Sequence, residues 1–203
     1  GMVKAKSVVS MMMLSFGSLG LIAVLWVLYG YAISFSNGGS STFFGIDGWF
    51  GIDTSFLGLS AQVADAAAPA GAFPSMAFVA FQATFAIITV ALISGAIADR
   101  AKFGAWMVFA GVWATLVYFP VANWVFNFTL ADGKVVDGGW IVYGLGVIDF
   151  AGGTAVHINA GAAGLALAIV LGKRFGFSKG ITQPHNVPLT LLGVALLWFG
   201  WFG

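Results

Sequence analysis

Long apolar stretches constrain this chain more than any other feature of its sequence. Most of them contain no charged residue and exceed the roughly 20 residues that a helix needs to cross the hydrocarbon core of a bilayer. Polar or glycine-rich connectors separate them, as is typical of loops. We therefore predict an all-α fold, a polytopic transmembrane helical bundle that forms one domain. Its spans are expected at about residues 8–35, 73–98, 103–128, 140–171 and 187–203.

The composition supports a membrane protein and excludes several other classes. Hydrophobic residues make up 60% of the chain and charged residues only 7%, so charged side chains cannot cover a water-exposed surface. The net charge of +1 gives no basis for nucleic-acid binding, and we expect no nucleic-acid partner. The absence of cysteine excludes disulfides and thiolate metal sites. We expect neither a metal nor a cofactor.

The basic residues are distributed unevenly among the connectors. Seven of the 8 Lys and Arg residues lie around residues 1–6, 99–102 and 173–179, and Lys134 is the exception. Because Lys and Arg near the ends of spans favour the cytoplasm, these three segments are predicted to be cytoplasmic. The chain is thus predicted to be a multi-pass protein of the cell membrane, in contact with the lipid bilayer.

Both ends of the chain interrupt this pattern. It begins GMVKAKS beside the first span and ends LLWFGWFG within an apolar run. A remnant of an expression tag would account for the initial Gly-Met but not for the other end. The sequence therefore predicts a fragment of a longer protein.

His157 is an ionisable residue in the middle of the fourth expected span. A charge at the bilayer centre costs at least about 2.5–3.5 kcal/mol on insertion scales, so such residues are rare. Gly161 and Gly164 would share its helix face and leave room beside the ring. One interpretation is a neutral imidazole that stabilises the bundle by bonding a neighbouring helix. The other, which the glycines favour, is a pore or proton site for a small polar solute.

Asp149 lies in the expected outer half of the same span. Gly152 and Gly153 weaken the helix behind it, so its carboxylate can cap the following turn by accepting backbone N–H bonds. About 80° separates Asp149 from His157 around an ideal helix, which argues against direct contact. We interpret Asp149 chiefly as a cap, and attraction of a cation at the outer mouth is a compatible alternative.

Aromatic residues make up 16% of the chain, and most are expected to pack or to face lipid. Phe81 and Phe85 are one helical turn apart in the second expected span. With Trp124 and Trp140 they could offer ring faces to a cation. The simpler interpretation is that the phenylalanines pack and that the tryptophans anchor the chain at the membrane interface.

Several motifs together resemble the ammonium transporter family (Amt, related to Rhesus proteins). They are DFAGGTAVHINAGAAGL at 149–165, FQATFAIITVALISG followed by GAIADRAKF at 81–103, and QPHNVP at 183–188 leading to GWFG. The resemblance extends along the whole chain. It implies that the chain covers about helices two to six of an eleven-helix fold built from two inverted repeats, as in other transporters.

The resemblance also implies roles for individual residues. His157 matches the first of two pore histidines, and Phe85 matches one of two stacked phenylalanines that gate the pore. Asp149 matches the acidic residue beneath the external ammonium site, where Phe81 is also placed. The tryptophan that walls this site aligns with Phe126, and Trp124 or Trp140 could replace it. Two residues of the last span, Leu197 and Trp201, are assigned to the pore.

The implied function is transport of ammonium through a hydrophobic pore in each protomer of a homotrimer. Ammonium, or its analogue methylammonium, would be recruited as the cation and pass the pore histidine as ammonia. Family members are commonly shut by a PII-type signalling protein on the cytoplasmic face, which makes such a protein an expected partner.

Two other functions stay open from the sequence. A membrane-embedded enzyme or haem protein would need a nucleophile and base or paired histidines within the spans, and the chain offers one mid-span histidine. We therefore expect no enzyme. An ammonium sensor with the same fold would need an output domain beyond this chain.

Overall fold

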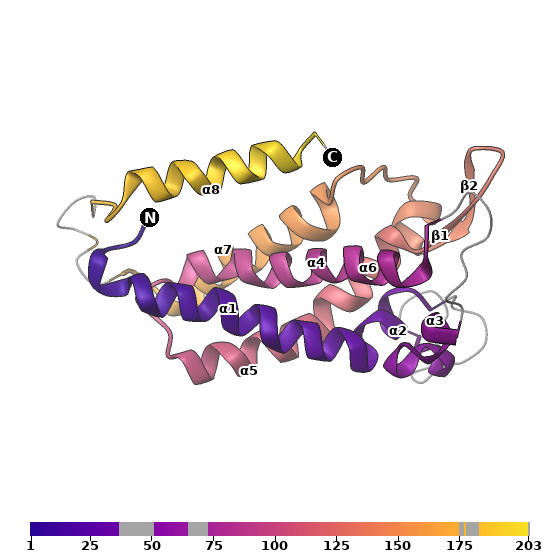
Figure 1. Ribbon diagram of the computed structural model, residues 1–203, viewed down its shortest axis with the longest axis horizontal. Coiled ribbons are helices and arrows are strands. Elements are labelled where there is room, and N and C mark those ends of the chain that lie inside the picture. Colours follow the sequence, from indigo (N-terminus) through magenta and orange to yellow (C-terminus); the bar gives the residue numbers. More distant parts are fainter. Residues whose placement is uncertain (37–50, 65–72, 175–176, 178–182, 203) are drawn as a thin grey trace.

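The computed structural model describes residues 1–36, 51–64, 73–174, 177 and 183–202. Lys179 and the last residue of the fifth expected span, Gly203, lie outside the described residues. The helices run along the long axis of the molecule, with a small hairpin and short helices at one end (Figure 1). This architecture confirms the prediction of an all-α bundle.

Among the described residues, four helices are long and apolar enough to cross a membrane. They are Ala5–Ser34, Ser75–Ile97, Phe103–Phe126 and Gly153–Leu171. A shorter apolar helix, Val187–Gly200, follows them.

These helices divide into regular and irregular segments. The α-helices are α1 (Val8–Leu25), α2 (Tyr31–Ser34), α3 (Ser60–Ala64), α4 (Ser75–Ile93), α5 (Phe103–Trp113), α6 (Phe119–Phe126), α7 (Asn159–Leu171) and α8 (Val187–Gly200). π-Helical turns lie at Trp26–Gly30, Ala114–Tyr118, Trp140–Gly144 and Gly153–Ile158. 3-10 turns lie at Ala5–Ser7, Thr54–Leu59 and Ser94–Ile97.

The centre of the bundle is the packing of α1 against α4 and α5. Two buried tryptophans connect these helices through backbone carbonyls. The indole of Trp106 in α5 donates to the carbonyl of Leu14 at 3.1 Å, and the indole of Trp26 donates to the carbonyl of Val79 in α4 at 3.1 Å. Both indoles are almost fully buried, so each bond offsets the cost of removing a polar group from water.

Two glycines allow α1 and the π-helical turn after it to approach neighbouring helices. A Cβ at Gly30 would meet the ring of Phe119 at 2.6 Å, and one at Gly17 would meet the side chains of Met107 and Phe103 at 2.8 Å. Phe119 packs in turn on Trp26, with ring centroids 5.8 Å apart. The aromatic core therefore fills the space that these glycines leave.

The end of the bundle near α6 carries a feature that the sequence analysis treated as a loop. Strands β1 (Phe128–Ala131) and β2 (Lys134–Gly138) form an antiparallel hairpin. Asp132 and Gly133 turn the chain with φ of 51° and 74°, the left-handed conformation that a tight hairpin turn requires. The expected span 103–128 is thus helical only as far as Phe126.

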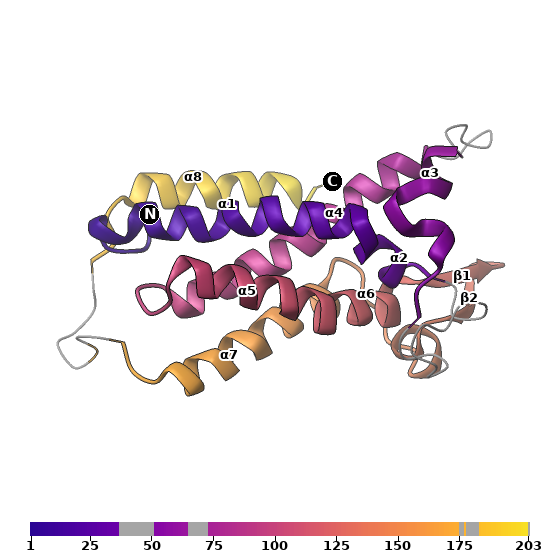
Figure 2. The same cartoon turned by 90° about the horizontal axis from the view of Figure 1, so that it is seen from below.

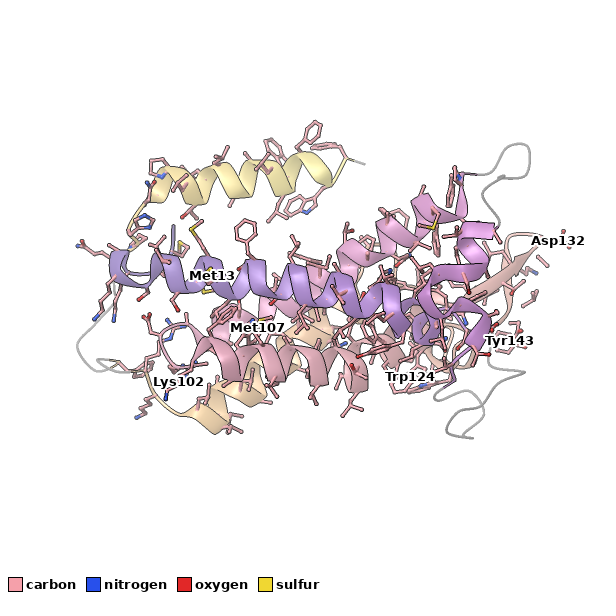
Figure 3. All side chains as sticks on the ribbon, turned by 60° about the horizontal axis from the view of Figure 1, so that its bottom comes forward. Met13, Lys102, Met107, Trp124, Asp132 and Tyr143 are labelled. Atoms are coloured by element: carbon pink, nitrogen blue, oxygen red, sulfur yellow. The ribbon has the colours of Figure 1, made fainter. Side chains whose placement is uncertain are left out.

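The described basic residues lie at the end of the bundle opposite the hairpin. The N-terminus, the turn between α4 and α5, the C-terminal end of α7 and the start of α8 lie at one end of the bundle, and β1, β2 and α3 lie at the other (Figure 2). Lys102 marks the first end, whereas Asp132 and Tyr143 mark the second (Figure 3). The side of the membrane that each end faces stays a prediction.

The fourth expected span differs most from the structure. The helix begins at Gly153, not at Trp140, and the segment 145–152 is not helical. Gly146 and Gly152 have φ of 64° and 81°, which helices do not accommodate. The sequence from 140 to 171 is therefore apolar throughout, but the glycine conformations at 146 and 152 interrupt the helix that hydropathy predicts. His157 lies about one turn inside the helix Gly153–Leu171, and its depth in the membrane stays a prediction.

Candidate functional site

Three phenylalanines from two helices form an aromatic cluster. Phe81 and Phe85 lie one turn apart on α4 with ring centroids 4.8 Å apart, edge to face. Phe126, the last residue of α6, lies 6.3 Å from the ring of Phe85. The side chain of Phe81 is 58% exposed, while Phe85 and Phe126 are partly buried. The structure thus brings together three of the residues assigned to an outer site, and one ring face of the cluster is accessible.

Trp124 and Trp140 form a separate pair beside the hairpin. Their ring centroids are 5.7 Å apart with an angle of 59° between the rings. The close fit depends on Gly139, because a Cβ there would collide with the backbone of Trp124 and the carbonyl of Asn123. This contact fixes the residue before Trp140 against α6.

Asp149 caps the helix that carries His157. Its Oδ1 accepts the N–H of Gly152 at 2.6 Å, and its Oδ2 accepts the N–H groups of Thr154 and Ala155, each at 2.9 Å. Gly152 makes this loop possible by adopting φ of 81°. The structure confirms the interpretation of Asp149 as a cap, although Asp149 lies in the loop before the helix and not within a span.

The carboxylate also changes the electrostatics of the helix start. A helix N-terminus carries a partial positive charge from its free N–H groups, which would repel a cation. Asp149 occupies three of these groups and places a full negative charge beside them. A cation near this end would therefore meet an attractive field.

His157 lies in the π-helical turn Gly153–Ile158 that leads into α7, and its side chain is exposed. Leu165 and Ile169 of α7 are 65% and 72% exposed. A Cβ at Gly161 would meet nothing within 4 Å. The expectation of room beside the imidazole is therefore confirmed at Gly161.

Gly164 has different surroundings from Gly161. A Cβ there would lie 3.4 Å from the Cβ of Ala96, in the turn that ends α4. Gly164 therefore faces this turn at ordinary van der Waals distance, whereas Gly161 borders open space. The two glycines thus lie at the boundary between the packed and the open sides of the helix.

The residues assigned to the pore on α8 lie apart from this site. Leu197 and Trp201 are 60% and 76% exposed, and the backbone N–H of Trp201 bonds the carbonyl of Leu197 at 3.2 Å. The start of α8 is tied to the N-terminus, where the N–H of His185 donates to the carbonyl of Val3 at 3.1 Å. The pore role of Leu197 and Trp201 stays a prediction.

Sequence reasoning missed the role of Arg100. Its guanidinium donates to the carbonyl of Ala96 and, at 2.5 Å, to the carbonyl of Gly172 after α7. From the sequence, an arginine directly after an apolar span was interpreted only as a charged loop residue. Its partner Gly172 lies 72 positions away, so no local pattern indicates the contact.

Comparison with known proteins relates this arrangement to one family. The whole chain, residues 1–203, matches the sequence profile of the Ammonium Transporter Family. The chain belongs to the ammonium transporter family. All of its length aligns with the ammonium transporter of Mycobacterium tuberculosis at 56% identity and with that of Bacillus subtilis at 45% identity.

Solved structures agree with this assignment. The crystal structure of Candida albicans Mep2 superimposes with a TM-score of 0.71 and 34% identity, over 91% of this chain and 37% of that one. The chain spans 44% of the length of the M. tuberculosis relative and 45% of that of the B. subtilis relative. Family membership and the four apolar helices among the described residues indicate that this chain is part of a multi-pass membrane protein.

Proposed function

We propose that this chain forms part of an ammonium transporter in which His157 lines a hydrophobic pore. The observation that carries the proposal is the position of His157, exposed in the turn that leads into α7, together with the open space at Gly161. Membership of the ammonium transporter family supplies the substrate class. A neutral imidazole can both donate a hydrogen bond to ammonia and accept one from it.

The aromatic cluster of Phe81, Phe85 and Phe126 is the proposed recruitment site for the cation. Ammonium is attracted to ring faces, and the edge-to-face geometry of Phe81 and Phe85 leaves ring surface available. Asp149 would add negative potential without direct contact, because three backbone N–H groups already occupy its oxygens. Trp140, paired with Trp124, is proposed to extend the outer wall.

Passage through the apolar interior favours the uncharged form. Moving an ion of this size into a low-dielectric interior costs several kcal/mol even after relaxation, whereas ammonia avoids this cost. Phe85 would separate the outer site from the pore, and Leu197 and Trp201 of α8 are proposed to line the pore further on. In this scheme ammonium transfers its proton to water on the outer side of Phe85, and ammonia enters the pore.

The assembly and regulation of the transporter belong to the same proposal. We expect a homotrimer in the cell membrane with one pore in each protomer, and the basic end of the bundle on the cytoplasmic side. A PII-type signalling protein is the expected partner of that side. The lipid bilayer contacts exposed apolar side chains such as Val9 of α1 and Leu116 of the π-helical turn after α5, which are 73% and 67% exposed.

Uptake of labelled methylammonium by cells that express the full-length protein tests the proposal. His157→Ala should abolish or strongly alter uptake, because it removes the hydrogen-bonding group from the pore wall. Ile158→Ala is the matched control, since Ile158 is the neighbouring exposed residue of the same turn. Unchanged uptake in the His157 variant at normal expression would return this residue to a packing role. A full-length protein that binds ammonium without flux would favour a sensor.

A further inference from the structure

The helical segment that carries His157, Gly153–Leu171, is packed along one side. Ala155 and Val156 of its first turn and Ala160 of α7 are buried, and Ala163 and Leu167 are partly buried against the core. These residues form one narrow side that faces α4 and the turn Ser94–Ile97. The small side chains among them, such as Ala160 and Ala163, allow close approach of the helices.

Hydrogen bonds from outside the segment hold both of its ends. At the start, Asp149 accepts three backbone N–H groups of the first turn. At the other end, Gly172 follows α7 with φ of 71°, and its carbonyl accepts a hydrogen bond from Arg100. The negative charge thus lies at the positive end of the helix dipole and the positive charge lies at the negative end.

Arg100 makes a second hydrogen bond, to the turn that ends α4. The same guanidinium donates to the carbonyl of Ala96, in the 3-10 turn that ends α4, and its Nε is buried. Ala96 is also the residue on which Gly164 of α7 packs. The planar guanidinium therefore connects the end of the helix that carries Phe85 to the end of the helix that carries His157.

We propose that Arg100 is a positioning residue for conduction, which sets the axial position of α7 relative to α4 and thereby that of His157 relative to Phe85. This inference rests on the proposed function of those two residues. Fifteen residues separate His157 from Gly172, about 22 Å of helix at 1.5 Å per residue, so Arg100 acts without touching the solute. The guanidinium holds its donors in a fixed planar fork that reaches the two carbonyls, whereas a lysine ammonium has three donors on a flexible stem and no such fixed geometry.

The test uses the full-length protein and three variants. Arg100→Gln removes the charge and the fork, and Arg100→Lys keeps the charge without the fork. Lys102→Gln is the matched control, because it removes the same charge from an exposed side chain in the same turn. We expect the maximal rate of methylammonium uptake to fall about tenfold or more in Arg100→Gln, since small misplacements of reacting groups have effects of this size. The concentration for half-maximal uptake should stay unchanged, because the outer site is intact.

A distance measurement separates positioning from a general loss of stability. The 203 residues contain no cysteine, so Ile88→Cys on α4 and Leu165→Cys on α7 provide exposed sites for spin labels. The distance between the labels should shift or broaden in Arg100→Gln and remain unchanged in Lys102→Gln. Arg100→Lys should give a smaller change in the same direction, and it replaces the glutamine variant if that variant does not fold.

The outcomes distinguish this inference from the proposed function. A folded Arg100→Gln or Arg100→Lys protein with the wild-type distance and uptake rate would overturn the positioning role. If His157→Ala left uptake unchanged, the pore role of His157 would fail, while the label distances would still decide whether Arg100 positions α7. Equal loss of rate in Arg100→Gln and Lys102→Gln would show that loop charge, not the two carbonyl bonds, is the property that matters.

Discussion

Asp149 shows how a carboxylate is accommodated next to a membrane-spanning helix. Each of its oxygens accepts at least one backbone N–H group, so the charge is solvated by the protein itself. The donors are groups that every helix start leaves without partners. One residue therefore stabilises the helix and offsets its dipole.

Substitution of Asp149 separates capping from charge. Asp149→Ala should destabilise the full-length protein by about 1–2 kcal/mol, the usual cost of losing a helix cap. Asp149→Asn keeps one capping oxygen, so it should unfold at a higher temperature and retain more transport than the alanine variant. Thermal unfolding and methylammonium uptake, measured on both variants, check this order. If both variants folded normally and lost transport equally, charge and not capping would be the essential property.

A glycine matters for helix packing only where it lies against a neighbouring helix. Gly30 lies against the ring of Phe119, whereas Gly20 on α1 has no atom within 4 Å of the position of an added Cβ. Both glycines lie in the same apolar span, and hydropathy does not distinguish them. The contact at Gly30 belongs to the aromatic core, where Trp26 and Phe119 are almost fully buried.

Alanine substitutions at these two glycines test the packing of this element. Gly30→Ala should lower the free energy of unfolding by about 1–3 kcal/mol, because a well-packed core does not accept an extra methyl group without movement. Gly20→Ala should be neutral or slightly stabilising, since alanine has the higher helix propensity. Chemical or thermal unfolding of the two full-length variants in detergent measures the difference. Equal stability would mean that Phe119 moves away at little cost.

At the scale of the whole molecule, one side of the bundle is packed and another is open. α1, α4 and α5 share a core of buried aromatic and aliphatic side chains, while the described part of α8 contains no buried residue. His157, in the turn that leads into α7, is also exposed. A closed, water-excluding pore needs a wall on both sides of the imidazole, and the described residues supply one side.

The 203-residue chain on its own is therefore expected to give no ammonium flux in liposomes. Its exposed imidazole and apolar faces would meet lipid or a neighbouring chain, so the protein should also associate heterogeneously. Flux of methylammonium and the size distribution in detergent measure both effects, and a chain of the length of its relatives serves as the control. Selective flux from the 203 residues alone would show that the open face of α7 is not part of a pore.

The sequence by itself determined the features that short stretches of chain encode. Apolar runs indicate helices that cross a membrane, and the motifs around Asp149 and His157 indicate the family. The cap was predictable because its donors lie within six residues of the carboxylate. Only the tertiary structure decided the contact of Phe126 with Phe85, the start of the helix at Gly153 and the bond from Arg100 to Gly172. The two contacts join residues far apart in the sequence, and the helix start depends on glycine conformations, so neither hydropathy nor local spacing contains them.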